Sequence, residues 1–268
     1  MFHRGLTHSV IGLVVLPLAL AAGLWWAYRG RTRFGWLALL CACGVALHLL
    51  YDLTTSWGTM LLYPFSARRY ALDWLFIVDL VTWAVPIAVL VGSRVRPERA
   101  RVAVAGGMLA LFAYGGVSAV VHRDAVAAIV AAERASGMGV AEAAVFPRFG
   151  APFRWHGVVV ATPGTGEPRI ATYEVRGIPP APALAGRLPR SFDDPWVAAA
   201  LASRAGQAYL WWARVPVATA AREGDEVVVT VRDLRYSRTL VPTAESWTPF
   251  DIRFRFDTRT RRLIEVRW

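Results

Sequence analysis

The chain has 268 residues, of which 56% are hydrophobic, and a formal net charge of +11. Together with a mean hydropathy of +0.39, this composition is too apolar for an ordinary soluble domain and predicts an integral membrane protein with a soluble part. All 30 basic residues are arginine and those of the C-terminal half are scattered among acidic residues, so we expect no nucleic-acid partner.

Four runs with few or no charged residues have about the length of a membrane-spanning helix. They cover residues 10–28, 35–51, 74–93 and 102–121. Residues 1–121 are therefore predicted to form an α-helical membrane bundle of about four transmembrane helices. The first run also resembles a cleavable signal peptide, but its terminal Trp25, Trp26 and Tyr28 favour a membrane interface. A shorter apolar segment, 57–65, is expected to lie in the interface or to re-enter the membrane.

The arginines between these runs predict the orientation of the bundle. Residues 29–33 carry three arginines and residues 94–101 carry four, whereas the loops at the other end carry fewer near the membrane. The positive-inside rule places the arginine-rich loops in the cytoplasm. We expect a multi-pass protein of a bacterial inner membrane, with residues 1–9, the 52–73 loop and the C-terminal domain on the periplasmic side.

Residues 122–268 are predicted to form a small soluble α+β domain. Residues 122–135 continue the last helix, and strand-like runs follow at 153–161 and 169–175. Asp193 or Asp194 before Pro195 favours a helix start, and that helix is expected to reach Trp212.

Three later segments of this domain alternate apolar and polar residues with a period of two. They begin at Val227, Ile252 and Ile264. This period is typical of half-buried strands, and the last two segments are predicted to form a hairpin.

The residues most informative about function are histidines and aspartates at the ends of the apolar runs. His48 and Asp52 are four residues apart, which places both side chains on one face of a helix. Histidine and aspartate are ligands of zinc, manganese and iron, and ionisable groups at membrane depth are costly unless they serve a function. The alternative is a histidine that binds the aspartate for packing alone.

The N-terminal segment adds two further histidines. His3 and His8 are five residues apart, so they converge only if the chain bends, and Gly5 is the candidate bend. Thr7 is a candidate cap for the helix that follows, which would place His8 in its first turn. Arg4 is expected to hold a phosphate or a carboxylate. A polar tail without partners is the alternative interpretation.

The topology brings these segments together. His8 begins the first run, Asp52 ends the second and Asp73 begins the third, so alternating helices place all three at one face of the membrane. Asp79 is expected about one and a half turns deeper, as a ligand, an acceptor for a histidine N–H or a packing partner. The arginines at 68–69 suit an anionic headgroup or phosphate, or are ordinary loop charges.

Two motifs carry a resemblance to a known family. HRGLTHS at 3–9 and HLLYDLTTSWGTMLLYPFSARRYALDW at 48–74, with the nearby Asp79, closely resemble the YdjM-type inner-membrane proteins, which are described as predicted membrane-bound metal-dependent hydrolases. The similarity is expected to continue through FPRFGAPFRWHGVVV at 146–160. Family members usually begin with another apolar segment that carries a histidine and an Asp-rich turn. We therefore expect either a truncated start or a member without those ligands.

These observations predict metal-assisted hydrolysis of a phosphoester in a lipid or lipid-linked substrate. The expected ligands of one or two divalent ions, zinc first and manganese or iron as alternatives, are His3, His8, His48 and Asp52. Asp73, Asp79 and Arg4 are the expected catalytic groups. The rival hypothesis is a non-enzymatic, membrane-anchored binding or scaffold protein with a degenerate metal site. The lipid bilayer is the one partner that both hypotheses require.

Overall fold

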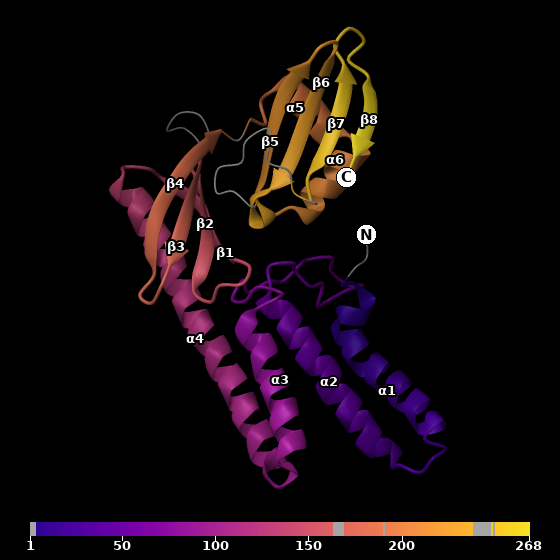
Figure 1. The fold of residues 1–268 in the computed structure, drawn as a ribbon. Helices are drawn as coiled ribbons and strands as arrows, with labels where there is room; N and C mark the ends of the chain where they lie inside the picture. The colour runs from indigo at the N-terminus through magenta and orange to yellow at the C-terminus, as the bar shows by residue number, and fades with distance from the viewer. Residues whose placement is uncertain (1–3, 163–168, 190, 238–247, 249) are drawn as a thin grey trace. The chain divides into compact units, whose positions relative to one another are not determined.

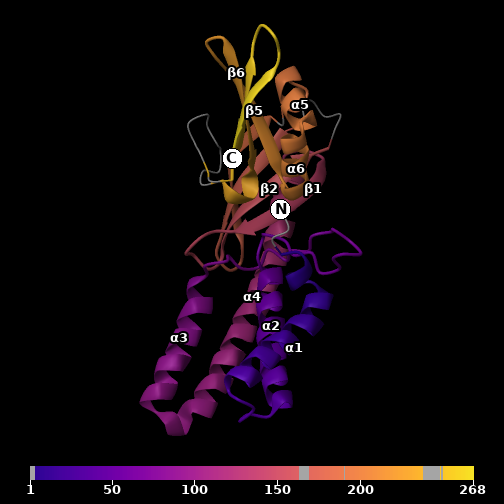
Figure 2. The same cartoon turned by 90° about the vertical axis from the view of Figure 1, so that its right-hand side faces the viewer.

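The computed structural model describes residues 4–162, 169–189, 191–237, 248 and 250–268. The chain forms two compact units (Figures 1 and 2). The first consists of Met1–His122 with Pro147–Pro152, and the second of Arg123–Phe146 with Phe153–Trp268.

The first unit is helical. Its helices are α1 (Val10–Ala27), α2 (Phe34–Thr54), α3 (Leu80–Val95) and α4 (Ala100–Ala135), the last of which continues into the second unit. Large apolar side chains, such as Leu18, Trp83 and Leu109, remain exposed on the helices. Apolar helices with exposed apolar faces are suited to lipid surroundings, because every backbone polar group is satisfied within the helix.

Three of the helical segments are long and apolar enough to cross a membrane: Val10–Ala27, Phe34–Thr54 and Pro97–Ala135. Helix α3 has 16 residues, a length of about 24 Å against a hydrocarbon core of about 30 Å. The run predicted at 74–93 is helical only from Leu80, because Asp79 caps the helix there. Among its described residues, the structure therefore supports three spans of full length and one shorter apolar helix.

The arginine-rich turns lie at one end of this unit. Figures 1 and 2 both show the α1–α2 and α3–α4 connections at the same end, as the sequence predicts. At the other end, the segment between α2 and α3 folds back on the end of α2. Thr59 and Tyr70 exchange two backbone hydrogen bonds of 2.9 Å, and the Trp74 N–H donates to the Thr54 carbonyl. The apolar segment 57–65 forms turns and a bridge here, not a helix.

In its described residues, the second unit contains the end of α4, two antiparallel four-stranded sheets and two further short α-helices, a mixture of helices and strands as predicted. The first sheet has the order β1 (Val140–Pro147), β2 (Arg154–Ala161), β3 (Arg169–Arg176) and β4 (Ala181–Pro189). The second has the order β5 (Pro216–Glu223), β6 (Glu226–Asp233), β7 (Ile252–Asp257) and β8 (Leu263–Arg267). The predicted hairpin is β7–β8.

Two short helices of this unit pack on the second sheet. They are α5 (Pro195–Ala202) and α6 (Arg204–Trp212), and Val197 and Ala200 of α5 share a core with Val229 and Phe254. The single helix expected from 195 to 212 is interrupted at Ser203. This residue caps α6, since its Oγ accepts a hydrogen bond of 3.1 Å from the Gly206 N–H.

A buried carboxylate joins the end of α4 to the first sheet. Glu133 is 2% exposed and accepts hydrogen bonds from the Tyr173 hydroxyl and, at 2.8 Å, from Arg187 Nη1. Burial and this carboxylate raise the pKa of Tyr173 to about 12, so the phenol remains a neutral donor at physiological pH. The Glu133 carboxylate thus has one cationic partner, Arg187, and one neutral hydrogen-bond donor, Tyr173.

We predict that Arg187→Ala lowers the free energy of unfolding by about 3 kcal/mol, because it leaves the Glu133 carboxylate buried without its cation. Arg176→Ala is the matched control, since it breaks an arginine–glutamate pair of the same sheet whose Arg176 side chain is 61% exposed. That pair should contribute less than about 1 kcal/mol. Denaturant unfolding followed by tryptophan fluorescence measures both, and equal losses would contradict the assignment.

Candidate metal centre

The N-terminal segment reaches the end of α2 through a bend before α1. Arg4 has a φ of 60° and Gly5 lies in a bend, after which Leu6–His8 form a 3₁₀ turn, η1. The Met60 N–H donates to the Arg4 carbonyl at 3.3 Å, and the Val10 N–H donates to the Leu61 carbonyl at 2.9 Å. The segment is therefore fixed between α1 and the loop that follows α2.

Two small residues let η1 lie against the first turn of α1. A Cβ on Gly12 would come within 2.5 Å of the Leu6 carbonyl oxygen, so only glycine fits there. Ser9, not the predicted Thr7, caps α1, and its Oγ accepts from the Gly12 N–H at 3.2 Å. His8 consequently precedes the helix and does not lie in its first turn.

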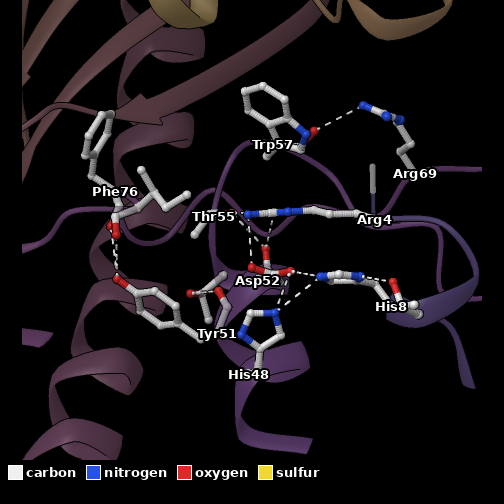
Figure 3. Close-up of polar contacts among 12 residues, drawn as sticks. Arg4, His8, His48, Tyr51, Asp52, Thr55, Trp57, Arg69 and Phe76 are labelled. Atoms are coloured by element: carbon white, nitrogen blue, oxygen red, sulfur yellow. Dashed lines mark hydrogen bonds and ion pairs between the residues drawn. The ribbon is translucent and has the colours of Figure 1, made fainter. Parts of the chain in front are cut away.

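Asp52 is the centre of the polar cluster. It lies in the last turn of α2 and is 5% exposed. Its Oδ1 pairs with Arg4 Nη2 at 2.9 Å, and Arg4 Nη1 donates to Thr55 Oγ1 at 3.1 Å (Figure 3). Of the two anions expected for Arg4, the structure contains the carboxylate.

The second oxygen of Asp52 faces two histidines. Oδ2 is 3.4 Å from His8 Nε2 and 3.7 Å from His48 Nε2, and the two Nε2 atoms are 3.3 Å apart (Figure 3). Among the described residues, Oδ2 is buried and accepts no hydrogen bond. The predicted juxtaposition of His48, Asp52 and His8 is thus present, with three ligand-type atoms directed to one point.

This geometry has the dimensions of a metal site. Zinc binds histidine nitrogen and carboxylate oxygen at about 2.0–2.1 Å, and tetrahedral geometry then separates neighbouring ligand atoms by about 3.3 Å. The three separations of 3.3, 3.4 and 3.7 Å are close to that value. No other group of three histidine, cysteine or acidic residues with such spacing is found in the part of the chain that the structure describes.

The two histidines of the cluster have different surroundings: His8 contacts a hydroxyl group, and His48 is exposed. His8 Nδ1 lies 2.8 Å from Thr7 Oγ1, and donation of the Nδ1 proton to this hydroxyl leaves the lone pair of Nε2 for a ligand. The His48 side chain is 63% exposed, so the cluster is accessible from one side. Catalytic metal sites have this form, with three protein ligands and an open position.

The family comparison covers the helical part of the chain. Residues 1–125 match the model of the family described as YdjM inner membrane protein. Residues 1–125 are therefore similar to this family. The match ends before the C-terminal half, so the continuation of the resemblance through 146–160 is not part of it. Neither a curated protein nor a solved structure matches the chain.

The remaining described candidate residues of the matched region lie outside the cluster of His8, His48 and Asp52. His3 lies outside the described residues. Asp73 is buried beside the end of α2, where the neighbouring Leu72 N–H donates to the Leu53 carbonyl at 2.8 Å. Asp79 is at the helix start and not one and a half turns inside it, because its Oδ1 accepts from the first N–H groups of α3. Its Oδ2 accepts from the Tyr114 hydroxyl at 2.7 Å.

The two loop arginines also have protein partners. The Arg68 guanidinium lies 5.4 Å from the centre of the Tyr70 ring. Arg69 Nη1 donates to the Trp57 carbonyl at 3.5 Å (Figure 3). Thr7 was predicted to cap a helix, but in the structure its Oγ1 contacts Nδ1 of His8, the ring nitrogen that faces away from Asp52. Its position next to a candidate ligand is the signal that identifies it, since ligand histidines usually bind a second polar group.

We predict that a double-mutant cycle of Arg4→Gln and Asp52→Asn gives a coupling free energy of at least about 2 kcal/mol, because the pair is buried and each partner alone would leave an unbalanced charge. Unfolding of detergent-solubilised protein measures it. The control cycle combines Asp52→Asn with Arg31→Gln in the α1–α2 turn and should be additive within about 0.5 kcal/mol. Additivity in the first cycle would contradict the pair.

Proposed function

We propose that this protein is a membrane-bound, metal-dependent hydrolase whose zinc ion is held by His8, His48 and Asp52. The observation that carries the proposal is the convergence of three ligand atoms at separations of 3.3, 3.4 and 3.7 Å. The general description of YdjM-type proteins as predicted metal-dependent hydrolases supports it. Manganese or iron is the alternative ion for the same donor set.

When bound, zinc would lower the pKa of a coordinated water and stabilise the negative charge that develops on the phosphoryl oxygens. The residues of the chain divide the supporting tasks. Arg4 holds Oδ1 of Asp52 and so directs Oδ2 toward the two histidines. Thr7 holds the outer nitrogen of His8 and sets the direction of its ring. The exposure of His48 leaves room for a substrate to approach.

The location of the site favours a phosphoester in a lipid or a lipid-linked molecule. His8 and Asp52 lie at the ends of two apolar helices, which is the depth at which a bilayer presents its polar headgroups. The loop between α2 and α3 carries the exposed Arg68, which suits an anionic group. Asp73, buried beside the end of α2, is the candidate base. Asp79 is a positioning residue, because both its oxygens bind α3 or Tyr114.

A second candidate is a binding or scaffold function without catalysis. The observation that favours it is the Arg4–Asp52 pair, which already balances the charge of the carboxylate. A hydrogen bond between the two rings would then account for the 3.3 Å contact. In this case the cluster would join η1 to α2 and nothing more. Bound metal separates the two candidates.

We predict about one zinc ion per purified protein and chelator-sensitive hydrolysis of a phosphoester lipid such as phosphatidic acid. His48→Ala should lose the metal, because two ligands remain of three. Asp52→Asn keeps the side-chain volume but loses the charge, and its activity should fall by a factor of about 100 or more. Metal analysis by mass spectrometry and phosphate release measure these outcomes.

His122→Ala is the matched control for the histidine variant, since His122 lies on α4 and outside the three-residue cluster. It should retain both zinc and activity. Wild-type protein without zinc, manganese or iron, or His48→Ala with unchanged metal, would reject the metal site. Metal-loaded protein that is inactive on phosphoester, ester and amide substrates would favour the scaffold function.

We propose that the site and the C-terminal unit lie on the periplasmic side of the membrane. The arginine-rich turns at one end of the helices support it, because such loops remain in the cytoplasm. We predict that alkaline phosphatase fused after Trp268 is active and that the same reporter fused at Arg96 is inactive. The reverse pattern would place the site in the cytoplasm.

A further inference from the structure

An apolar groove leads from the two histidines along α1 and α2. Its volume is about 290 Å³. At one end it is lined by Thr7, His8 and His48. The rest of its wall is apolar or small and includes Leu16, Leu20, Cys41, Gly44, Val45 and Leu49. The groove is therefore polar only where it meets the candidate metal centre.

The groove follows the helical repeat of α2. Cys41, Gly44, Val45 and His48 are spaced at i, i+3, i+4 and i+7, so they form one continuous stripe. Asp52 continues this stripe one turn further. From Cys41 to His48 the stripe is about 10 Å long, and Leu16 and Leu20 of α1 form the opposite wall at i, i+4 spacing.

Gly44 creates part of this space. A Cβ built on Gly44 would meet no atom within 4 Å, so neither the backbone nor a neighbouring side chain requires glycine there. Glycine in a helix interior destabilises it by roughly 0.5–1 kcal/mol relative to alanine. Gly44 has no side chain to fill the groove, one helical turn before His48 on α2.

We propose that this groove binds a hydrocarbon chain of the substrate, so that the substrate is a membrane lipid whose headgroup lies at His8 and His48. The proposal rests on the proposed function for the identity of the reacting centre. The groove requires an occupant that is apolar along most of its length and polar at one end, which is the chemistry of an acyl or prenyl chain attached to a headgroup. Both walls belong to membrane-spanning helices, where such chains are the solvent.

The test uses the full-length protein in phosphatidylcholine vesicles that contain phosphatidic acid with a diazirine in the middle of one acyl chain. After photolysis, mass spectrometry locates the labelled residues. We expect labelling at Leu16, Leu20 and Val45, reduced at least fivefold by Gly44→Phe. Gly35→Phe on the same helix is the matched control, because a Cβ there also meets no atom within 4 Å and Gly35 does not line the groove. It should change labelling less than twofold.

Gly44→Leu, a smaller substitution, replaces Gly44→Phe if the latter fails to fold, and each variant is checked for an unchanged unfolding midpoint. Labelling at the groove that is no stronger than at exposed Val14 and Leu47, or that is insensitive to both Gly44 variants, overturns the proposal. Crosslinking of the groove to a second copy of the chain overturns it as well.

The same experiment separates failure of the groove from failure of the proposed function. Chain labelling should persist after chelation, because the apolar walls need no metal. Labelled but inactive or metal-free protein would reject the hydrolase and keep the lipid site. Active protein in which Gly44→Phe hydrolyses long-chain and dibutyryl phosphatidic acid in the wild-type ratio would keep the hydrolase and reject the groove.

Discussion

The buried pair of Arg4 and Asp52 determines the arrangement of the N-terminal end of this protein. A carboxylate that is 5% exposed at the end of a membrane helix requires a cation, and Arg4 supplies it at 2.9 Å. To do so, the chain bends at Gly5, adopts a left-handed backbone at Arg4 and forms η1 before α1 begins. That path carries His8 to the carboxylate. The position of one candidate ligand is therefore a consequence of charge balance at another.

The two carboxylate oxygens of Asp52 have different partners, so the same side chain can pair with Arg4 and also face the two histidines. Oδ1 binds Arg4, while Oδ2 faces only imidazole nitrogens among the described residues. Because Arg4 pairs with Oδ1, Oδ2 remains directed at the two histidines. In the scaffold alternative, a protonated histidine at 3.4 or 3.7 Å would be the partner of Oδ2.

The sequence predicts those parts of the site that depend on local periodicity. The spacing of His48 and Asp52 fixes their common face, and the order of the apolar runs brings His8 to the same end. The partner of Arg4 could not be chosen from sequence, since a phosphate and a carboxylate suit a guanidinium equally. Asp79 was placed too deep because the apolar residues 74–78 resemble a helix, whereas the structure begins the helix at the aspartate cap.

The same distinction applies to the C-terminal unit. Strands β6 and β7, with alternating valine, isoleucine and phenylalanine, were predicted. Strands β1, β4 and β5 were not, because they are rich in alanine or proline and carry few β-branched residues. Pairing with neighbours, not intrinsic preference, makes them strands. The interruption at Ser203 was hidden for a similar reason, since serine is compatible with both a helix interior and a cap.

The three candidate metal ligands and the side chains that bind them all come from residues 4–55. Arg4, Thr7 and His8 precede α1, and His48, Asp52 and Thr55 lie at the end of α2. Backbone contacts fix the N-terminal segment as far as Leu61 and the end of α2 as far as Leu75, before α3 begins. During synthesis, the centre can form as soon as this helical hairpin has entered the membrane, before α3, α4 or either sheet exists. Because the N-terminal residues are synthesised first, the three candidate ligands can come together while most of the protein is still untranslated.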